Sequence, residues 1–254
     1  MKNQNKHPFF AEVIESSLDH YTAQCWNWKQ FPTFGSLVSI QDKELHILGI
    51  VTNIQTGSMD PSRTPFAYQK TEEELEREQP QIFAFLKTTF SVQACGYIKP
   101  TLSHSTSSPA RQAQGERREI IDSLINVDDT HGLAKPLTLS LSQAAGPTGQ
   151  ERADSPIIFA IPPTPPKIHA FVSEAPDTLT TQFFADAQFL EVLYGFSNAI
   201  QNLDELLLAI IRTVKAKNLL SANLLEEISH GFALLSGNDY RRLKVFLHRI
   251  EQIK

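Results

Sequence analysis

Three consecutive glutamates, Glu72–Glu74, are the most concentrated group of side chains in this 254-residue sequence that could carry out acid–base or metal chemistry. On a helix, however, consecutive side chains point in different directions and cannot converge on one ion. Thr71, with Glu74 three positions later, instead predicts a capping box, and acidic residues in a first turn interact favourably with the helix dipole. We therefore expect a solvent-exposed helix start, at which Glu73→Gln is close to neutral.

The motifs of the common nucleotide-binding and catalytic sites are absent from the sequence. No glycine precedes a lysine, so the phosphate-binding loop motif is missing. The segment "GPTGQER" has the wrong spacing and no lysine, and a flexible loop is favoured there over a phosphate site. The patterns G-x-G-x-x-G, G-x-S-x-G and H-E-x-x-H do not occur. His169 follows a rigid proline-rich segment, but a structural or solvent-facing role is favoured for it. Because these motifs are missing, we expect no catalytic residue, no cofactor and no metal site. The alternative, an enzyme of unrecognised type, predicts a deep pocket with converging titratable groups.

The charge, the cysteines and the apolar runs of the sequence indicate the cellular compartment in which the chain is found. Cys25 and Cys95 lie outside any CxxC pair, which favours small core residues over reactive thiols and indicates a reducing compartment. The net charge of −5 gives no general attraction to nucleic acid. No apolar run is long enough to cross a membrane, and the N-terminal residues lack the apolar core of a secretory signal. We expect a cytoplasmic protein without a membrane span.

Aromatic residues suggest two partner-binding surfaces. Trp26 and Trp28 are two positions apart, so on a strand they would share one face and could form a stacking or partner surface. A place in the barrel core is an equal alternative for this pair. The segment "SRTPFAY" presents Arg63, Phe66 and Tyr68 in an extended turn stiffened by proline, which is typical of a docking loop.

The last predicted helix carries a cluster of basic side chains. Arg241, Arg242, Lys244 and Arg249 could contact an acidic partner or the backbone of a nucleic acid. Because the rest of the chain is acidic, an ordinary solvated helix face is the favoured interpretation.

The first hundred residues have the pattern of a small antiparallel β-barrel, with short β-branched and aromatic runs between turns. Gly35 and Gly49 fall where such a barrel bends or brings backbones together. A helical excursion interrupts the pattern at residues 70–87, and Pro80 should begin its second helix, "PQIFAFLKT". We expect this apolar half to plug or cap the barrel end, and Phe83→Ala and Phe85→Ala to destabilise the fold by a few kcal/mol. The predicted strands are residues 9–17, 22–28, 35–41, 45–57 and 90–98.

Amphipathic patterns dominate the chain from residue 180 onward and predict a bundle of about four helices. The fold class is therefore α+β, with a β domain at residues 1–175 and a helical bundle at residues 176–254. Polar composition predicts a disordered loop at about residues 99–118 and a flexible loop at about residues 143–155. The predicted helices are residues 180–199, 203–218, 222–235 and 239–253.

The β-rich part resembles the HAS-barrel family. The resemblance is carried by "FGSLVSIQDKELHILGIVTNIQTG", by "RTPFAYQKTEEELEREQPQIFAFLKTTFSVQACGY" and by "PPTPPKIHAFV", and it covers roughly residues 8–98 and 156–173. This barrel is shared by HerA-type DNA translocases and by subunits of F-type and V-type ATP synthases. The sequence is most similar to the stand-alone HAS-barrel proteins of cyanobacterial type, in which a helical tail follows the barrel.

The resemblance implies an assembly role without catalysis. In the ATPases of this family the barrel packs subunits into a ring beside a catalytic domain, whereas here helices stand in that place and no Walker motif occurs. We therefore expect a non-enzymatic interaction or assembly module whose partner is a protein, either a second copy of the chain or a ring-forming ATPase. The alternative is an accessory subunit of a DNA-processing or ATP-driven machine that contacts nucleic acid through the basic C-terminal helix.

Overall fold

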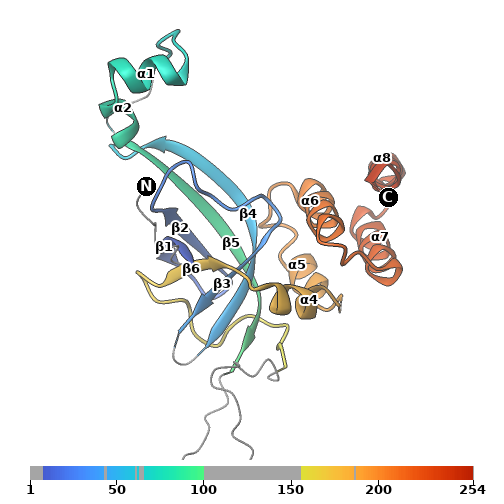
Figure 1. The fold of residues 1–254 in the computed structure, drawn as a ribbon. Coiled ribbons are helices and arrows are strands. Elements are labelled where there is room, and N and C mark those ends of the chain that lie inside the picture. Colours follow the sequence, from blue (N-terminus) through green and yellow to red (C-terminus); the bar gives the residue numbers. More distant parts are fainter. Residues whose placement is uncertain are drawn as a thin grey trace, which may run out of the picture. The chain divides into compact units, whose positions relative to one another are not determined.

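The computed structural model describes residues 8–42, 45–60, 62, 66–99, 156–185 and 187–253 (Figure 1). Apart from Lys99, the two predicted loops at residues 99–118 and 143–155 lie outside these described residues. The strands are β1 (Phe9–Ser16), β2 (His20–Cys25), β3 (Leu37–Gln41), β4 (His46–Ser58), β5 (Leu86–Ile98) and β6 (Phe171–Glu174). The helices are α1 (Glu72–Glu78), α2 (Gln81–Ala84), α4 (Asp177–Ala185), α5 (Phe189–Gly195), α6 (Leu203–Ala216), α7 (Ala222–Ser236) and α8 (Tyr240–Ile253).

The six strands form a closed antiparallel barrel in the order β1-β2-β5-β4-β3-β6. The closing strand is β6, which pairs with β1 on one side and with β3 on the other, although residues 99–170 separate it from β5. His169 lies at the entry to β6 in the left-handed region, with φ 67°, and its amide donates to the Val13 carbonyl at 2.9 Å. The His169 Nδ1 is also 2.7 Å from the Glu12 carboxylate, so this histidine has a structural role at the barrel seam.

Apolar side chains fill the interior of the barrel. The rings of Phe10 and Phe90 stack there with their centroids 5.8 Å apart. Both cysteines are buried free thiols, as expected, and burial raises the pKa of Cys25 to about 11 and that of Cys95 to about 12. The interior cluster consists of Phe10, Ala11, Val13, Tyr21, Ala23, Cys25, Val38, Ile40, Leu45, Ile47, Val51, Phe90, Val92, Ala94 and Val172.

A second hydrophobic core joins strands of the barrel to the C-terminal helices. Gly35, at φ 79°, allows the close approach of α6, because a Cβ at this position would lie 2.9 Å from the Cβ of Ala209. The strand residues of this core are Leu37, Leu48, Ile50, Cys95 and Ile98. The helices therefore pack against the barrel, and the predicted division between residues 175 and 176 stays a prediction.

The last three predicted helices are present in the structure as α6, α7 and α8, with bounds close to those expected. Ser221 caps α7, because its hydroxyl accepts from the Leu224 amide at 3.1 Å. The stretch predicted as a single helix at residues 180–199 instead contains two short helices, α4 and α5. The overall α+β architecture, with an N-terminal barrel followed by helices, is confirmed.

The excursion between β4 and β5 differs in part from expectation. The predicted capping box of Thr71 and Glu74 is present at the start of α1. However, α2 spans four residues, and the chain returns to strand at Leu86. The pairing of β4 with β5 continues to Ser58 and Leu86, so a two-stranded ribbon carries both helices beyond the rest of the sheet (Figure 1). The expectation that this segment plugs the barrel is therefore wrong, and no residue of α1 or α2 is buried.

The tight contact between β4 and β5 gives a first prediction. A Cβ at Gly49 would lie 2.5 Å from Val92 Cγ1 and 2.8 Å from the Gln93 carbonyl oxygen, whereas a Cβ at Gly57 would meet nothing within 4 Å. Gly49→Ala should lower the free energy of unfolding by roughly 1–3 kcal/mol, because the core must shift to admit the methyl group. Gly57→Ala, the matched control in the same strand, should stay within about 0.5 kcal/mol. Urea unfolding measures both, and equal effects would contradict the packing described for the barrel.

Candidate interaction surfaces

The two tryptophans do not form the shared strand face that their spacing suggested. β2 ends at Cys25, so Trp26 and Trp28 both lie in the turn that follows it. Trp26 is half exposed and meets the Phe171 ring edge-on at 5.5 Å, next to the barrel seam. Trp28 stacks on the Phe83 ring at 5.6 Å with an interplanar angle of 7°. The expectation of one strand face is therefore wrong, and the partner-binding role of each tryptophan stays a prediction.

A cluster of five side chains, here named the anchor cluster, ties the excursion to the turn after β2. Lys29 Nζ lies 2.5 Å from Glu72 Oε1 and 2.6 Å from Glu76 Oε1. The same ammonium lies 5.2 Å from the Trp28 ring centroid and 5.7 Å from that of Phe83. The hydrogen bonds to Glu72 and Glu76 raise the pKa of Lys29. Because α1 and α2 have no buried residue, this polar and aromatic contact fixes their position.

Of the predicted docking loop, the structure describes Phe66, which is exposed, and Tyr68, which is half-buried. Phe66 is 67% exposed, and its ring lies 4.2 Å from the ring of Tyr68. Met59 and Phe85 are adjacent at the end of the ribbon, where the Met59 amide donates to the Phe85 carbonyl at 2.7 Å, and both side chains are exposed. We name these four residues the excursion surface. Arg63, the third residue of the predicted docking loop, lies outside the described residues.

Ion pairs with α6 occupy two of the four basic residues of α8. Arg242 binds both carboxylate oxygens of Asp204, with Nε 2.9 Å from Oδ2. Arg249 binds Glu205 in the same two-pronged way, with Nη2 2.8 Å from Oε2. The Arg242 guanidinium holds the pKa of Asp204 below its ordinary value. These two arginines therefore fasten α8 to the first turn of α6.

Fewer basic side chains of α8 are available to a partner than the sequence suggested. Arg241 and Lys244 are exposed, and neither makes an ion pair within the described residues. Two cations remain for a nucleic-acid backbone or an acidic partner, and both roles stay predictions.

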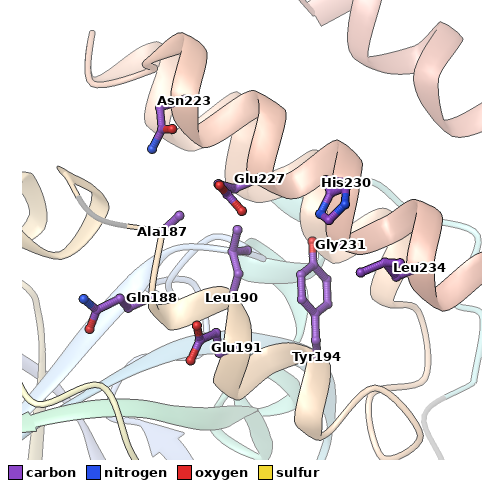
Figure 2. A pocket seen from close by; sticks show the side chains of 10 residues that line it. All are labelled: Ala187, Gln188, Leu190, Glu191, Tyr194, Asn223, Glu227, His230, Gly231 and Leu234. Carbon is purple, nitrogen blue, oxygen red and sulfur yellow. The ribbon is translucent and has the colours of Figure 1, made fainter.

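A groove of about 360 Å³ lies between α5 and α7, which we name the α5–α7 groove (Figure 2). The Tyr194 hydroxyl crosses it and donates to the Ile228 carbonyl at 3.0 Å. No sequence motif marks this groove, because it arises from the pairing of two helices. The one local signal was Gly231 in the middle of a helical pattern. The lining residues are Ala187, Gln188, Leu190, Glu191, Tyr194, Asn223, Glu227, His230, Gly231 and Leu234.

The part of the chain that the structure describes shows neither a metal-binding cluster nor a membrane-spanning helix. No group of three or more His, Cys, Asp and Glu side chains is arranged there to hold a metal ion. None of the helices in that part combines the length and apolar character needed to cross a membrane.

Comparison with known protein families agrees with the barrel. Residues 10–101 match the model of the HAS barrel domain, which confirms the resemblance for this segment. The closing strand β6 lies outside the matched segment, so the barrel is completed by residues far along the chain. No protein among the curated sequences matches the chain.

The anchor cluster gives a second prediction. Phe83→Ala removes the ring that stacks on Trp28, so the free energy of unfolding should fall by about 0.5–1.5 kcal/mol. This replaces the larger loss expected for a plugged barrel, and Phe85→Ala should cost less still, because Phe85 is 45% exposed. Hydrogen exchange of the α1 amides should accelerate in Phe83→Ala. It should stay unchanged in Glu73→Gln, a control that changes an exposed residue of α1 itself. Unchanged exchange in Phe83→Ala would show that the stack does not hold the excursion.

The ion pair between α6 and α8 gives a third prediction. The pKa of Asp204 is lower in the folded chain than its ordinary value of 3.8, so the pair stabilises the fold above that value. This stability is lost as the pH falls through the lowered pKa. Asp204→Asn should therefore reduce the free energy of unfolding by up to about 1 kcal/mol near pH 7, and the difference from wild type should close in acid. Urea unfolding across this pH range measures the effect, with Glu251→Gln as an exposed control on α8. If the free energies of unfolding of wild type and Asp204→Asn differed by the same amount at every pH, the ion pair would not be the source of the stability.

Proposed function

Because the chain carries a HAS barrel domain, we propose that it is a non-enzymatic interaction or assembly module that docks to a protein partner through the excursion surface. The observation that carries this proposal is the exposure of Phe66 in the excursion, whose helices α1 and α2 contact the turn after β2 through the anchor cluster. An exposed aromatic side chain on a positioned segment loses little conformational freedom on binding, which favours affinity. Exposed apolar groups of this kind often mark protein interfaces.

The packing of the barrel supports a scaffold role. Its interior is occupied by the apolar cluster around Phe90 and Val92, so contacts with other molecules are left to its outer surface and attachments. One part of that outer surface is covered by the C-terminal helices. The projecting excursion is therefore the attachment that most readily reaches a second molecule.

The partner class follows from the composition of the excursion. Aromatic rings and a methionine offer an apolar contact, and the acidic helix α1 beside them favours a partner with basic groups at its rim. Both a second copy of this chain and a ring-forming ATPase remain candidates for that partner. Light scattering of the purified chain distinguishes them, because self-assembly raises the measured mass and a strict monomer excludes it. The two free buried cysteines suit a cytoplasmic location.

The excursion surface gives a fourth prediction. The double variant Phe66→Ala/Tyr68→Ala should lose at least about tenfold in affinity for the partner that co-purifies with the chain from its native source, because the exposed Phe66 ring and the Tyr68 ring beside it are both removed. Its thermal midpoint should match that of wild type, because Phe66 is exposed and Tyr68 is not part of either core. Phe31→Ala, which removes another exposed ring from the turn after β2, should keep the partner. Equal recovery of the partner by all three chains would refute docking through the excursion.

The alternative function, contact with nucleic acid through α8, rests on Arg241 and Lys244. The structure weakens it, because Arg242 and Arg249 already bind carboxylates of α6. A DNA mobility shift at low salt that Arg241→Gln/Lys244→Gln abolishes would support this alternative, and no shift at low salt would exclude it.

A further inference from the structure

A second groove, of about 270 Å³, lies between the first turn of α6 and helix α8, and we name it the α6–α8 groove. Three arginines of α8 line it, and Val245 adds an exposed apolar side chain. Its two aspartates already serve α8 itself, because Asp204 binds the Arg242 guanidinium and Asp239 accepts from the Arg242 amide at 2.9 Å. Arg241 is exposed in the same lining and makes no ion pair with a described residue.

The exposed side of α8 extends this groove outward. Tyr240 and Lys244 are four residues apart, as are Arg241 and Val245, so the four side chains share one side of the helix, which we name the α8 face. Tyr240 is 75% exposed and Val245 is 54% exposed. Lys244, like Arg241, has no carboxylate partner among the described residues. The α8 face therefore combines an aromatic and an aliphatic contact with two cations that lack a partner.

The excursion surface combines apolar contact with the opposite charge. Its residues are aromatic rings and a methionine, and α1 begins four positions after Tyr68 in the chain. Helix α1 contains five glutamates and a single cation, Arg77. Lys29 and Lys70 form ion pairs with some of these glutamates, but the cations remain fewer than the carboxylates. A net negative charge is therefore left beside the excursion surface at neutral pH.

Neither of the two surfaces is covered within a single copy of the chain. Phe66 and Tyr240, the most exposed ring of each surface, have most of their area open to solvent. Helices α1 and α2 instead contact the turn after β2 through the anchor cluster. The excursion surface and the α8 face are therefore both available to a second molecule.

We infer that the excursion surface of one copy docks on the α8 face and the α6–α8 groove of a second copy. This inference rests on the proposed docking role of the excursion and identifies its partner as another copy of the same chain. Charge complementarity favours this occupant, because the acidic α1 would meet the cations Arg241 and Lys244 at the rim of the contact. The contact would also remove the rings of Phe66 and Tyr240 from water.

The two surfaces differ, so the contact is heterologous, and a pair of copies keeps one unused surface of each kind. This arrangement makes a specific demand on variants. A copy that has lost only its excursion surface can still receive a neighbour on its α8 face. A copy that has lost only its α8 face can still dock through its excursion.

The test uses two complementary variants of the full chain in sedimentation velocity over a range of concentrations. Phe66→Ala/Tyr68→Ala removes the excursion rings and keeps the α8 face, whereas Arg241→Glu/Lys244→Glu reverses the rim charges and keeps the excursion. Each variant alone should self-associate at least about tenfold more weakly than wild type. A mixture of the two should form a one-to-one complex with about the wild-type affinity, because each copy supplies one intact surface.

Salt and a control substitution separate this contact from a general charge effect. Added salt should weaken the wild-type self-association, because it screens the exposed charges at the rim. Arg212→Glu, which reverses an exposed cation of α6 outside the groove lining, should self-associate as wild type does. Thermal unfolding checks that each variant is folded, and Arg241→Gln/Lys244→Gln replaces the glutamate variant if that variant unfolds.

Three results would overturn the inference. A wild-type chain that stays monomeric at every concentration would exclude a second copy as the occupant. In that case, loss of the native partner by Phe66→Ala/Tyr68→Ala would leave the proposed docking function standing. Unchanged self-association of the α8 variant, or no complex in the mixture of the two variants, would show that the α8 face does not receive the excursion. Self-association that requires added nucleic acid would assign the cations of α8 to nucleic acid instead.

Discussion

The pairing of β6 with both β1 and β3 is the constraint on which the rest of the structure depends. Without it, the backbone groups on the facing edges of β1 and β3 would lack partners, and the apolar interior would open to water. The strand is short, and His169 at its entry takes a left-handed conformation held by the Val13 carbonyl and the Glu12 carboxylate. Closure by β6 also brings the chain directly to α4, so the helices begin beside the barrel.

The barrel is closed and apolar side chains fill its interior. Contacts with other molecules must therefore use its outer surface or the segments attached to it. The helices bury one part of its outer surface and are themselves tied together by ion pairs between α6 and α8. The excursion is attached differently, because no residue of α1 or α2 is buried and Lys29 with Trp28 supplies the contact. A segment held in this way has a defined position, yet little free energy is needed to rearrange it. These properties suit a binding element better than a structural one.

The features that could be predicted from sequence are those governed by short-range rules. The strand runs, the capping box at Thr71 and the cap at Ser221 follow from alternation and from side-chain hydrogen bonds a few residues apart. The misplaced features depend on distant partners. The predicted length of the second helix was wrong, because Leu86 pairs with Ser58 of β4 and so belongs to a strand. The predicted strand face shared by the two tryptophans was wrong, because β2 ends at Cys25. The α5–α7 groove was missed because it exists only where two helices, separate in the sequence, meet in the fold.

The central claim, that the barrel is a scaffold and the excursion is the docking element, is tested most directly by hydrogen exchange. The chain would be compared free and in the complex isolated from its native source, with exchange followed by mass spectrometry. The account predicts that exchange slows in residues 66–85 on complex formation while the interior strands stay as they were. Unchanged exchange across the excursion, with new protection confined to another part of the chain, would contradict it.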